Sequence, residues 1–231
     1  MNGIDFPPLL TGLAVAGDPF VTACGAAAEA EPGTVFFSPD EDSLQAAVLL
    51  APETPLAEAI SVSFAVSLGL NDAIGTLAPP EVGFHLEWPG SFRVNGAICG
   101  GMRVQASTTD PAIEPDWLVI GLHVPVRGAI SEHPGLAPDR TTLHAEGCQD
   151  IAVPDLTEMW ARHMMNWLHI YMTEGFGPLH AHYCARAHRI GEDVESPEPG
   201  RFVGLDERGG MILKDETGTR ILPLTRVLEK T

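Results

Sequence analysis

Basic residues are scarce in this sequence, and lysine is almost absent. Thirteen lysines and arginines stand against 31 acidic residues, which gives a formal net charge of −18. The two lysines are Lys214 and Lys230, and the first basic residue of any kind is Arg93. Because a negative field repels polyanions at long range, we expect neither a nucleic-acid partner nor a membrane partner. Alternatively, the negative charge serves only to keep the protein soluble.

Long apolar runs and paired cysteines are missing too. The first apolar stretch, residues 9–17, has about half the length that spans a bilayer, and no basic residue precedes it. We therefore predict neither a signal peptide nor a membrane helix. The cysteines lie far apart, at Cys24, Cys99, Cys148 and Cys184. This spacing favours reduced thiols over a disulfide framework, and hence a cytoplasmic protein.

Apolar residues make up 45% of the chain, enough for a sizeable core. Their spacing alternates between the period of strands and the period of helices. We predict strands at 34–37, 44–50, 82–87, 101–106 and 117–124, and helices at 55–70, 155–174 and 178–190. Residues 192–200 are acidic, contain two prolines and predict a linker. Short strands are expected beyond it, at 201–205, 211–214 and 219–222.

Several local motifs resemble those of one enzyme family. Residues 87–91 (E-W-P-G-S) resemble a K-W-P-N-D strand end, and residues 98–104 (I-C-G-G-M-R-V) resemble a K-x-A-G-I-L-V strand. Residues 119–126 resemble a V-I-G-I-G-I-N-V strand, 174–183 a pair of late helices, and 204–213 the start of an SH3-like domain. In this order and spacing, the motifs are similar to those of the biotin and lipoate protein ligases.

The resemblance implies an α+β fold, with a mixed β-sheet and packed helices as in the class II biotin and lipoate ligases. On this basis we expect a ligase-like domain at 1–191, the linker at 192–200 and a small SH3-like β domain at 201–231. Sheet-like sequence begins within the first forty residues, so the DNA-binding domain of the repressor-type members has no room before it.

The resemblance also implies an ATP-dependent chemistry for which this sequence lacks the usual cations. Members of the family activate the carboxylate of biotin on the α-phosphate of ATP with Mg²⁺, then pass the acyl group to a lysine of a carrier domain. Positive groups stabilise the phosphate charge throughout. Here Ile98 and Glu87 stand at motif lysines, Pro125 stands at a motif asparagine, and the loop at 36–42 has three acids and no cation. We therefore expect lost or altered adenylating activity.

The motif residues that remain predict a more neutral ligand site. Glycines and the Trp-Pro pair let a flat ligand approach the backbone, and arginines offer bidentate contacts to a carboxylate. The predicted ligand-binding residues are Trp88, Pro89, Gly90, Ser91, Arg93, Gly100, Gly101, Arg103, Gly121 and His123. Their expected partner is a small carboxylate or a biotinyl or lipoyl carrier domain. Alternatively, the glycines and the Trp-Pro pair serve folding alone and the arginines are solvated.

Other functions stay open at this point. One is an active ATP-dependent biotin or lipoate ligase whose cations come from a partner or from an unrecognised arginine. Another is acyl transfer through the thiol of Cys99, which would need a lowered pKa. His85, Glu87 and His123 could together form a proton-transfer or metal group.

A further alternative is a metal-binding or scaffold protein that uses a histidine and cysteine row. His180, Cys184 and His188 are spaced four apart, so a helix would place them on one stripe. His180 and Cys184 are the weak metal-ligand candidates. Three residues in one straight row cannot all surround a single ion, because the outer two lie about 12 Å apart along the helix axis.

Overall fold

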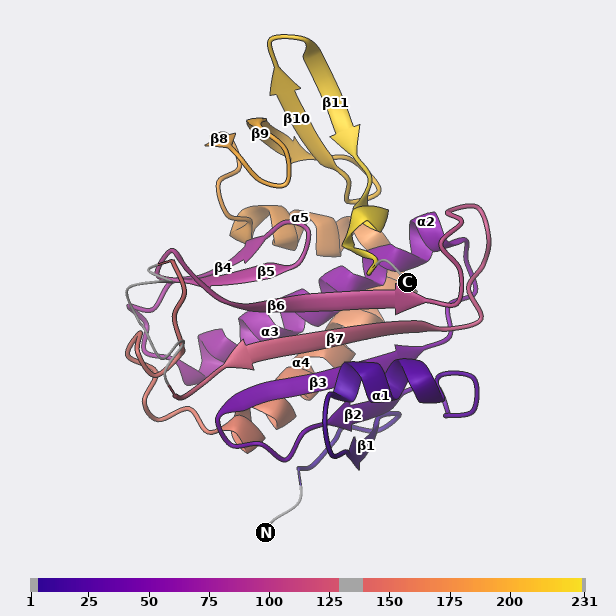
Figure 1. The fold of residues 1–231 in the computed structure, drawn as a ribbon, viewed down its shortest axis with the longest axis vertical. Helices are drawn as coiled ribbons and strands as arrows, with labels where there is room; N and C mark the ends of the chain where they lie inside the picture. Colours follow the sequence, from indigo (N-terminus) through magenta and orange to yellow (C-terminus); the bar gives the residue numbers. More distant parts are fainter. Residues whose placement is uncertain (1–3, 129–138, 230–231) are drawn as a thin grey trace.

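The computed structural model describes residues 4–128 and 139–229, which form one large mixed sheet and a smaller antiparallel sheet (Figure 1). The large sheet has the strand order β1-β2-β3-β7-β6-β5-β4. Its strands are β1 (Thr11–Ala14), β2 (Thr34–Phe37), β3 (Ser43–Leu50), β4 (Phe84–Glu87), β5 (Ser91–Val94), β6 (Ala97–Ala106) and β7 (Leu118–Pro125). β1 runs parallel to β2, and the other neighbouring strands are antiparallel.

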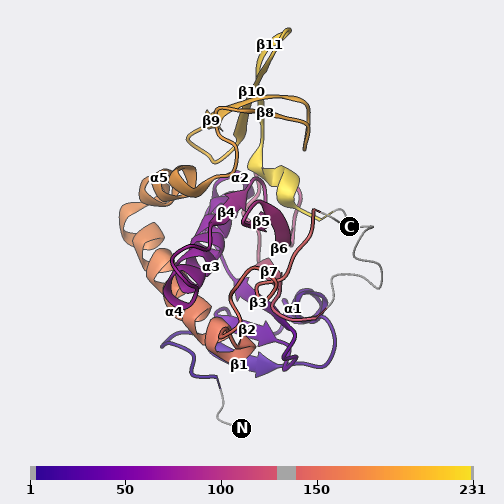
Figure 2. The ribbon, with the colours of Figure 1, turned by 90° about the vertical axis from the view of Figure 1, so that its left-hand side faces the viewer.

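Two long helices cover one face of the large sheet. α2 (Leu56–Ala59) and the 3₁₀ turn η1 (Ile60–Val62) lead into α3 (Ser63–Leu77), and α4 (Val153–Glu174) packs beside α3 (Figure 2). The two helices cross closely at Gly69, where a Cβ atom would lie 2.7 Å from the backbone of Met164. Leu56–Leu77 is apolar and long enough to cross a bilayer, but 72% of its most apolar window is buried, as expected of a core helix.

A short helix, α1 (Pro19–Ala26), covers part of the opposite face (Figure 2). Asp18 caps its N-terminus by accepting hydrogen bonds from the backbone amides of Phe20 and Val21, and Pro19 occupies the first helical position. The ring of Phe20 is 4% exposed and packs on β2, β3 and β7. α1 therefore closes a second, smaller apolar core on this face of the sheet.

The small sheet lies beyond α5 (Phe176–Arg186) and comprises β8 (Asp193–Val194), β9 (Gly200–Leu205), β10 (Met211–Asp215) and β11 (Gly218–Leu222). All its pairings are antiparallel, consistent with the expected SH3-like domain. Phe202 and Leu213 belong to the same apolar core as α3. In addition, the indole nitrogen of Trp88 donates to the carbonyl of Gly209 at 2.9 Å. The two sheets thus share one core.

The predicted α+β class, with a mixed sheet and a small β-sheet at the C-terminus, is confirmed by this architecture. Four details differ from the predictions. β1, α1 and β5 were not expected, and the helix predicted at 55–70 continues to Leu77. α5 ends at Arg186 rather than near residue 190, and the segment interpreted as a linker contains β8. The domain boundaries themselves stay predictions.

Candidate functional site

A small cavity lies on the large sheet beside α1, and we call it the sheet cavity. Its volume is about 240 Å³. Its lining residues come from the start of α1, from β3, from β6 and from β7: Asp18, Pro19, Phe20, Gln45, Ala46, Arg103, Gly121, Leu122 and His123. Strand pairing sets Gln45 and Gly101 on either side of His123, and Arg103 opposite Gly121. Four predicted ligand residues, Gly101, Arg103, Gly121 and His123, thus meet at one place.

Arg103 carries the positive charge of the sheet cavity, and two carboxylates already bind it. Its Nε and Nη2 atoms donate to the two carboxylate oxygens of Glu229 at 2.5 and 3.0 Å, and Nη1 donates to Asp18 at 2.5 Å. The guanidinium also lies 4.2 Å from the ring centroid of Phe20. Burial opposes ionisation of Asp18, but the hydrogen bonds from Arg103 and two backbone amides lower its pKa overall. The pair of anions was not foreseen from the sequence.

His123 and Gly121 shape the sheet cavity in different ways. The ring of His123 is exposed at its mouth, yet desolvation lowers the pKa of His123 against the opposing pull of Asp18 and Asp40. The lowered pKa favours the neutral imidazole at pH 7, in which one ring nitrogen donates a hydrogen bond and the other accepts one. Gly121 makes room for Phe20, because a Cβ atom there would lie 2.7 Å from the phenylalanine ring. This glycine is needed for the packing of α1.

Gly100 and Gly101 bring neighbouring strands unusually close together. Gly100 has φ +99°, and a Cβ atom there would collide with the carbonyl oxygen of His123. A Cβ atom at Gly101 would lie 3.0 Å from the carbonyl oxygen of Gly90, which accepts a hydrogen bond from the amide of Met102. Ser91 pairs with Gly101 across the same strands. At these positions the absence of a Cβ atom allows the close approach of the strands beneath the sheet cavity.

The other predicted ligand residues lie elsewhere. Trp88, with Pro89 next to it, is 4% exposed and faces the small sheet through its bond to Gly209. Arg93 binds both carboxylate oxygens of Glu87 at 2.9 Å, and its third nitrogen donates to the carbonyl of Gly96. Trp88 and Arg93 line a different cavity of about 220 Å³, against β8 and β9. The predicted set is therefore divided between two places, and Arg93 already has an intramolecular partner.

The acidic loop between β2 and β3 folds onto itself. Asp40 accepts hydrogen bonds from the amide of Asp42 and the hydroxyl of Ser43, and these bonds lower the pKa of Asp40. Asp42 in turn uses its carbonyl to accept the amides of Val126 and Arg127. The loop thus holds the carboxylate of Asp40 with its own donors, and its sequence contains no cation.

One arginine lies beside the position of the missing motif lysine. Arg140 forms an isolated backbone bridge with Ile98, and the amide of Ile98 donates to the carbonyl of Asp139 at 2.7 Å. Arg140 is exposed and makes no ion pair with any residue that the structure describes. Forty-two residues separate Arg140 from Ile98 in the sequence, so no local motif pointed to it.

The alternative groups of histidine, cysteine and glutamate do not assemble. Glu87 is bound to Arg93, and the ring of His85 lies 6.2 Å from that of His188, away from His123 and the sheet cavity. His188 follows the end of α5, so it does not continue the row of His180 and Cys184, whose side chains approach to 3.9 Å. Within residues 4–128 and 139–229, no three such side chains cluster as a metal site would require.

Cys99 is fully buried, and its thiol donates to the carbonyl of Pro125 at 3.6 Å. Burial raises the pKa of Cys99 to about 12. At neutral pH the thiol therefore stays protonated, whereas a nucleophile needs the thiolate. The environment of Cys99 therefore does not favour acyl transfer through its thiol, which would need a lowered pKa.

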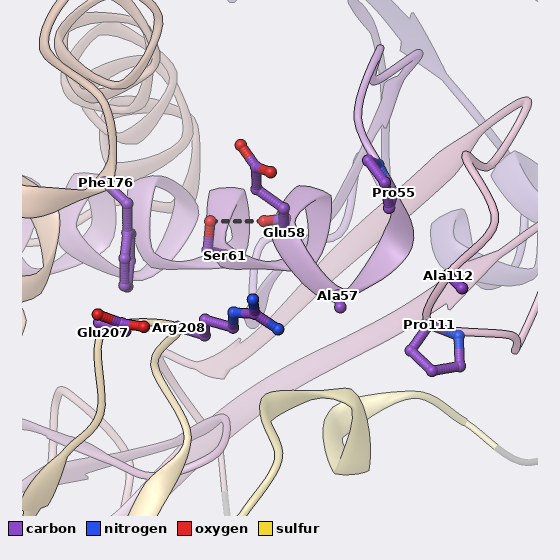
Figure 3. Close-up of a pocket in the computed structure, with 9 residues that line it drawn as sticks. All are labelled: Pro55, Ala57, Glu58, Ser61, Pro111, Ala112, Phe176, Glu207 and Arg208. Atoms are coloured by element: carbon purple, nitrogen blue, oxygen red, sulfur yellow. Dashed lines mark hydrogen bonds between the residues drawn. The ribbon is translucent and has the colours of Figure 1, made fainter.

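A further cavity, which was not predicted, lies between α2, the loop that joins β6 to β7 and the turn that joins β9 to β10 (Figure 3). It holds about 710 Å³ between Pro55, Ala57, Pro111 and Ala112 at one end and Phe176 at the other. Arg208 reaches across it, and the buried hydroxyl of Ser61 donates to the carbonyl of Glu58. The amides of Leu56 and Ala57 at the start of α2 are already bonded to the carbonyls of Ile113 and Pro111. This helix end therefore offers little to an anion.

Comparison with known proteins identifies the fold and the family. Residues 6–185 match the model of the biotin/lipoate A/B protein ligase family, and residues 190–230 match a domain of unknown function, DUF4444. A biotin–[acetyl-CoA-carboxylase] ligase of Paracoccus denitrificans is 26% identical over 188 residues, which cover 78% of this chain and 77% of that protein.

Two solved structures extend the comparison to almost the whole chain. A biotin protein ligase-like protein of unknown function from Silicibacter sp. TM1040 is 44% identical, covers 98% of this chain and 100% of its own, and has a TM-score of 0.92. The biotin protein ligase of Aquifex aeolicus is 19% identical, with 93% and 94% covered, and has a TM-score of 0.73. Since the family model alone spans more than half of its residues, this chain belongs to the biotin/lipoate A/B protein ligase family.

Proposed function

We propose that this chain is a biotin protein ligase-like protein whose adenylating activity is lost or altered, and that it binds a small carboxylate, free or on a carrier domain, at the sheet cavity. One observation carries the proposal. Arg103 is the only cation among the residues that line this cavity, and Glu229 and Asp18 already neutralise it. A cytoplasmic location and a carrier-domain partner are part of the same proposal.

ATP and Mg²⁺ fit this environment poorly. Preorganised cations supply much of the stabilisation in phosphoryl and adenylyl transfer, and losing one such donor costs roughly two to three orders of magnitude in rate. Here the acidic loop bonds its own Asp40, and Arg103 holds Asp18 and Glu229. The carboxylates near the cavity that would ligate Mg²⁺ are thus committed to other partners.

Two side chains favour a ligand different from that of the typical ligases. His123 stands at the second glycine of the V-I-G-I-G motif, and Arg103 stands at the leucine of K-x-A-G-I-L-V. Both line the sheet cavity, and Phe20 covers Gly121, so the free volume is only about 240 Å³. A bidentate contact of Arg103 with a carboxylate, and one hydrogen bond from the neutral ring of His123, would orient a small acid there.

Calorimetric titration tests the proposal directly. With MgATP we expect no binding up to about 1 mM, whereas the Aquifex aeolicus ligase run in parallel should bind it. Octanoate, lipoate and biotin are then titrated into the wild-type protein and into Arg103→Gln, which should lose any carboxylate binding. Micromolar affinity for ATP that requires Mg²⁺ would overturn the proposal.

An active ligase with an atypical site is the second candidate, and Arg140 is the observation that favours it. Because its backbone pairs with Ile98, its guanidinium could reach the region that the motif lysine serves in the family. Incubation with ATP, biotin or lipoate and a carrier domain, followed by intact-mass measurement, tests this candidate. Modification of the carrier by the wild type that is lost in Arg140→Ala would establish it, and an unmodified carrier would exclude it.

A further inference from the structure

The last described segment of the chain returns from the small sheet to the large one. After β11 the 3₁₀ helix η3 (Leu224–Val227), drawn in yellow in Figure 1, leads residues 228 and 229 to β6. Leu228 forms a parallel backbone bridge with Val104, and the amide of Glu229 donates to the carbonyl of Val104 at 2.9 Å. β5 pairs with β6 only as far as Gly101, so this segment takes the edge of β6 that β5 leaves uncovered.

The backbone hydrogen bond between Glu229 and Val104 places the carboxylate of Glu229 beside the guanidinium of Arg103, where it makes a two-point contact. Both carboxylate oxygens accept from the guanidinium, at 2.5 and 3.0 Å, which is the parallel two-point contact that arginine makes with carboxylate ligands. Asp18 takes the remaining nitrogen from the other side. Arg103 lines the sheet cavity, and Glu229, which is not among the lining residues, occupies the Nε and Nη2 edge of its guanidinium. A small acid that makes a two-point contact with this edge must displace Glu229.

We propose that the C-terminal segment is an intramolecular latch: Glu229 fills the carboxylate position on Arg103, and a small carboxylate entering the sheet cavity displaces it. The latch rests on the proposed function, because it regulates the same site. Displacement exchanges one bidentate ion pair for another, so the net charge on Arg103 is unchanged. The segment released is short, since Leu224 stays buried in the core while Leu228 is only partly buried.

The contacts that hold the latch are of the kind that a ligand can compete with. The side chains of Arg103 and Glu229 are both 38% exposed, so water and salt reach the ion pair. One backbone hydrogen bond and two partly buried side chains, Val227 and Leu228, complete the attachment. A latch closed in about nine molecules of ten would weaken the apparent affinity for a ligand about tenfold.

Glu229→Gln tests the latch, because it keeps the shape of the side chain and removes its charge. Glu216→Gln is the matched control, since Glu216 is exposed in the turn between β10 and β11 and makes no ion pair with a described residue. Hydrogen exchange is followed in residues 224–229 with octanoate, with octanamide as its uncharged isostere, and with sodium chloride at equal ionic strength. Octanoate affinity is measured by calorimetry for each protein.

We expect octanoate, but neither octanamide nor chloride, to speed exchange of residues 224–229 in the wild type and in Glu216→Gln. In Glu229→Gln these amides should exchange fast without ligand, and octanoate should bind about tenfold more tightly. Equal exchange and equal affinity in the wild type and Glu229→Gln would overturn the latch, even if ATP binding is absent. Conversely, the wild type could bind MgATP tightly while residues 224–229 of Glu229→Gln exchange fast. This result would overturn the proposed function but not the latch.

Discussion

Replacing Phe20 with alanine should detach α1 from the large sheet. The ring is 4% exposed and is the largest side chain that α1 places in the second core, where its helical neighbours are alanines. Truncating a buried phenylalanine typically costs about 3–5 kcal/mol. Loss of the cation–π contact with Arg103 adds about 0.5 kcal/mol. We therefore expect the free energy of unfolding to fall by at least 3 kcal/mol.

Urea unfolding gives the change in stability, and hydrogen exchange locates it. The amides of α1 should lose protection in Phe20→Ala more than those of α3. Val21→Ala is the control, because Val21 is 57% exposed on the same helix and should change stability by less than about 0.5 kcal/mol. A loss below about 1 kcal/mol in Phe20→Ala, with α1 still protected, would refute the view that this one ring anchors the helix.

Three further predictions concern other parts of the structure. Trp88→Phe leaves the buried carbonyl of Gly209 without its donor and should cost about 1–3 kcal/mol in urea unfolding; an unchanged midpoint would contradict this bond. Gly100→Ala should lower the melting temperature far more than Gly96→Ala, because both residues have positive φ but only Gly100 faces a backbone oxygen. Folding lowers the pKa of Asp18, so its contribution to stability is present above the unfolded pKa and is lost as pH falls through the folded value. Asp18→Asn, which can still cap α1, should therefore show a smaller loss of stability than the wild type between about pH 5 and 3, and parallel pH profiles would refute this.

The regular elements with clear periodicity were predictable, and the missed ones had signals of another kind. Small side chains leave α1 with little apolar contrast, but Asp18-Pro19 is a cap followed by a proline at the first helical position. β5 has four residues, too few for a periodicity. Asn95-Gly96 after it is a strong hairpin signal, and both residues have positive φ as a type I′ turn needs.

In the candidate site, only the contacts between neighbouring strands of one hairpin could be predicted from the sequence. Glu87 and Arg93 lie on neighbouring strands of one hairpin, so their ion pair follows from the pairing of β4 with β5. The partners of Arg103 lie 85 and 126 residues away, at opposite ends of the chain. No motif or period connects such positions, since the fold alone brings α1 and the C-terminal segment to β6. The motifs therefore predicted four residues that meet at the sheet cavity, but gave no sign of the carboxylates that bind Arg103 there.

The shared core has a consequence for how the chain is made. Gly209 packs against Phe64 of α3 and accepts the indole proton of Trp88, so residues near the end of the sequence cover side chains synthesised much earlier. Nascent domains generally form in order from the N-terminus, and uncovered apolar surface invites aggregation. On the ribosome, Phe64 and Trp88 therefore lack their contacts with Gly209 until β9 and β10 have emerged. Premature termination before β9 would thus release a chain that lacks the contacts of Gly209 with Phe64 and Trp88.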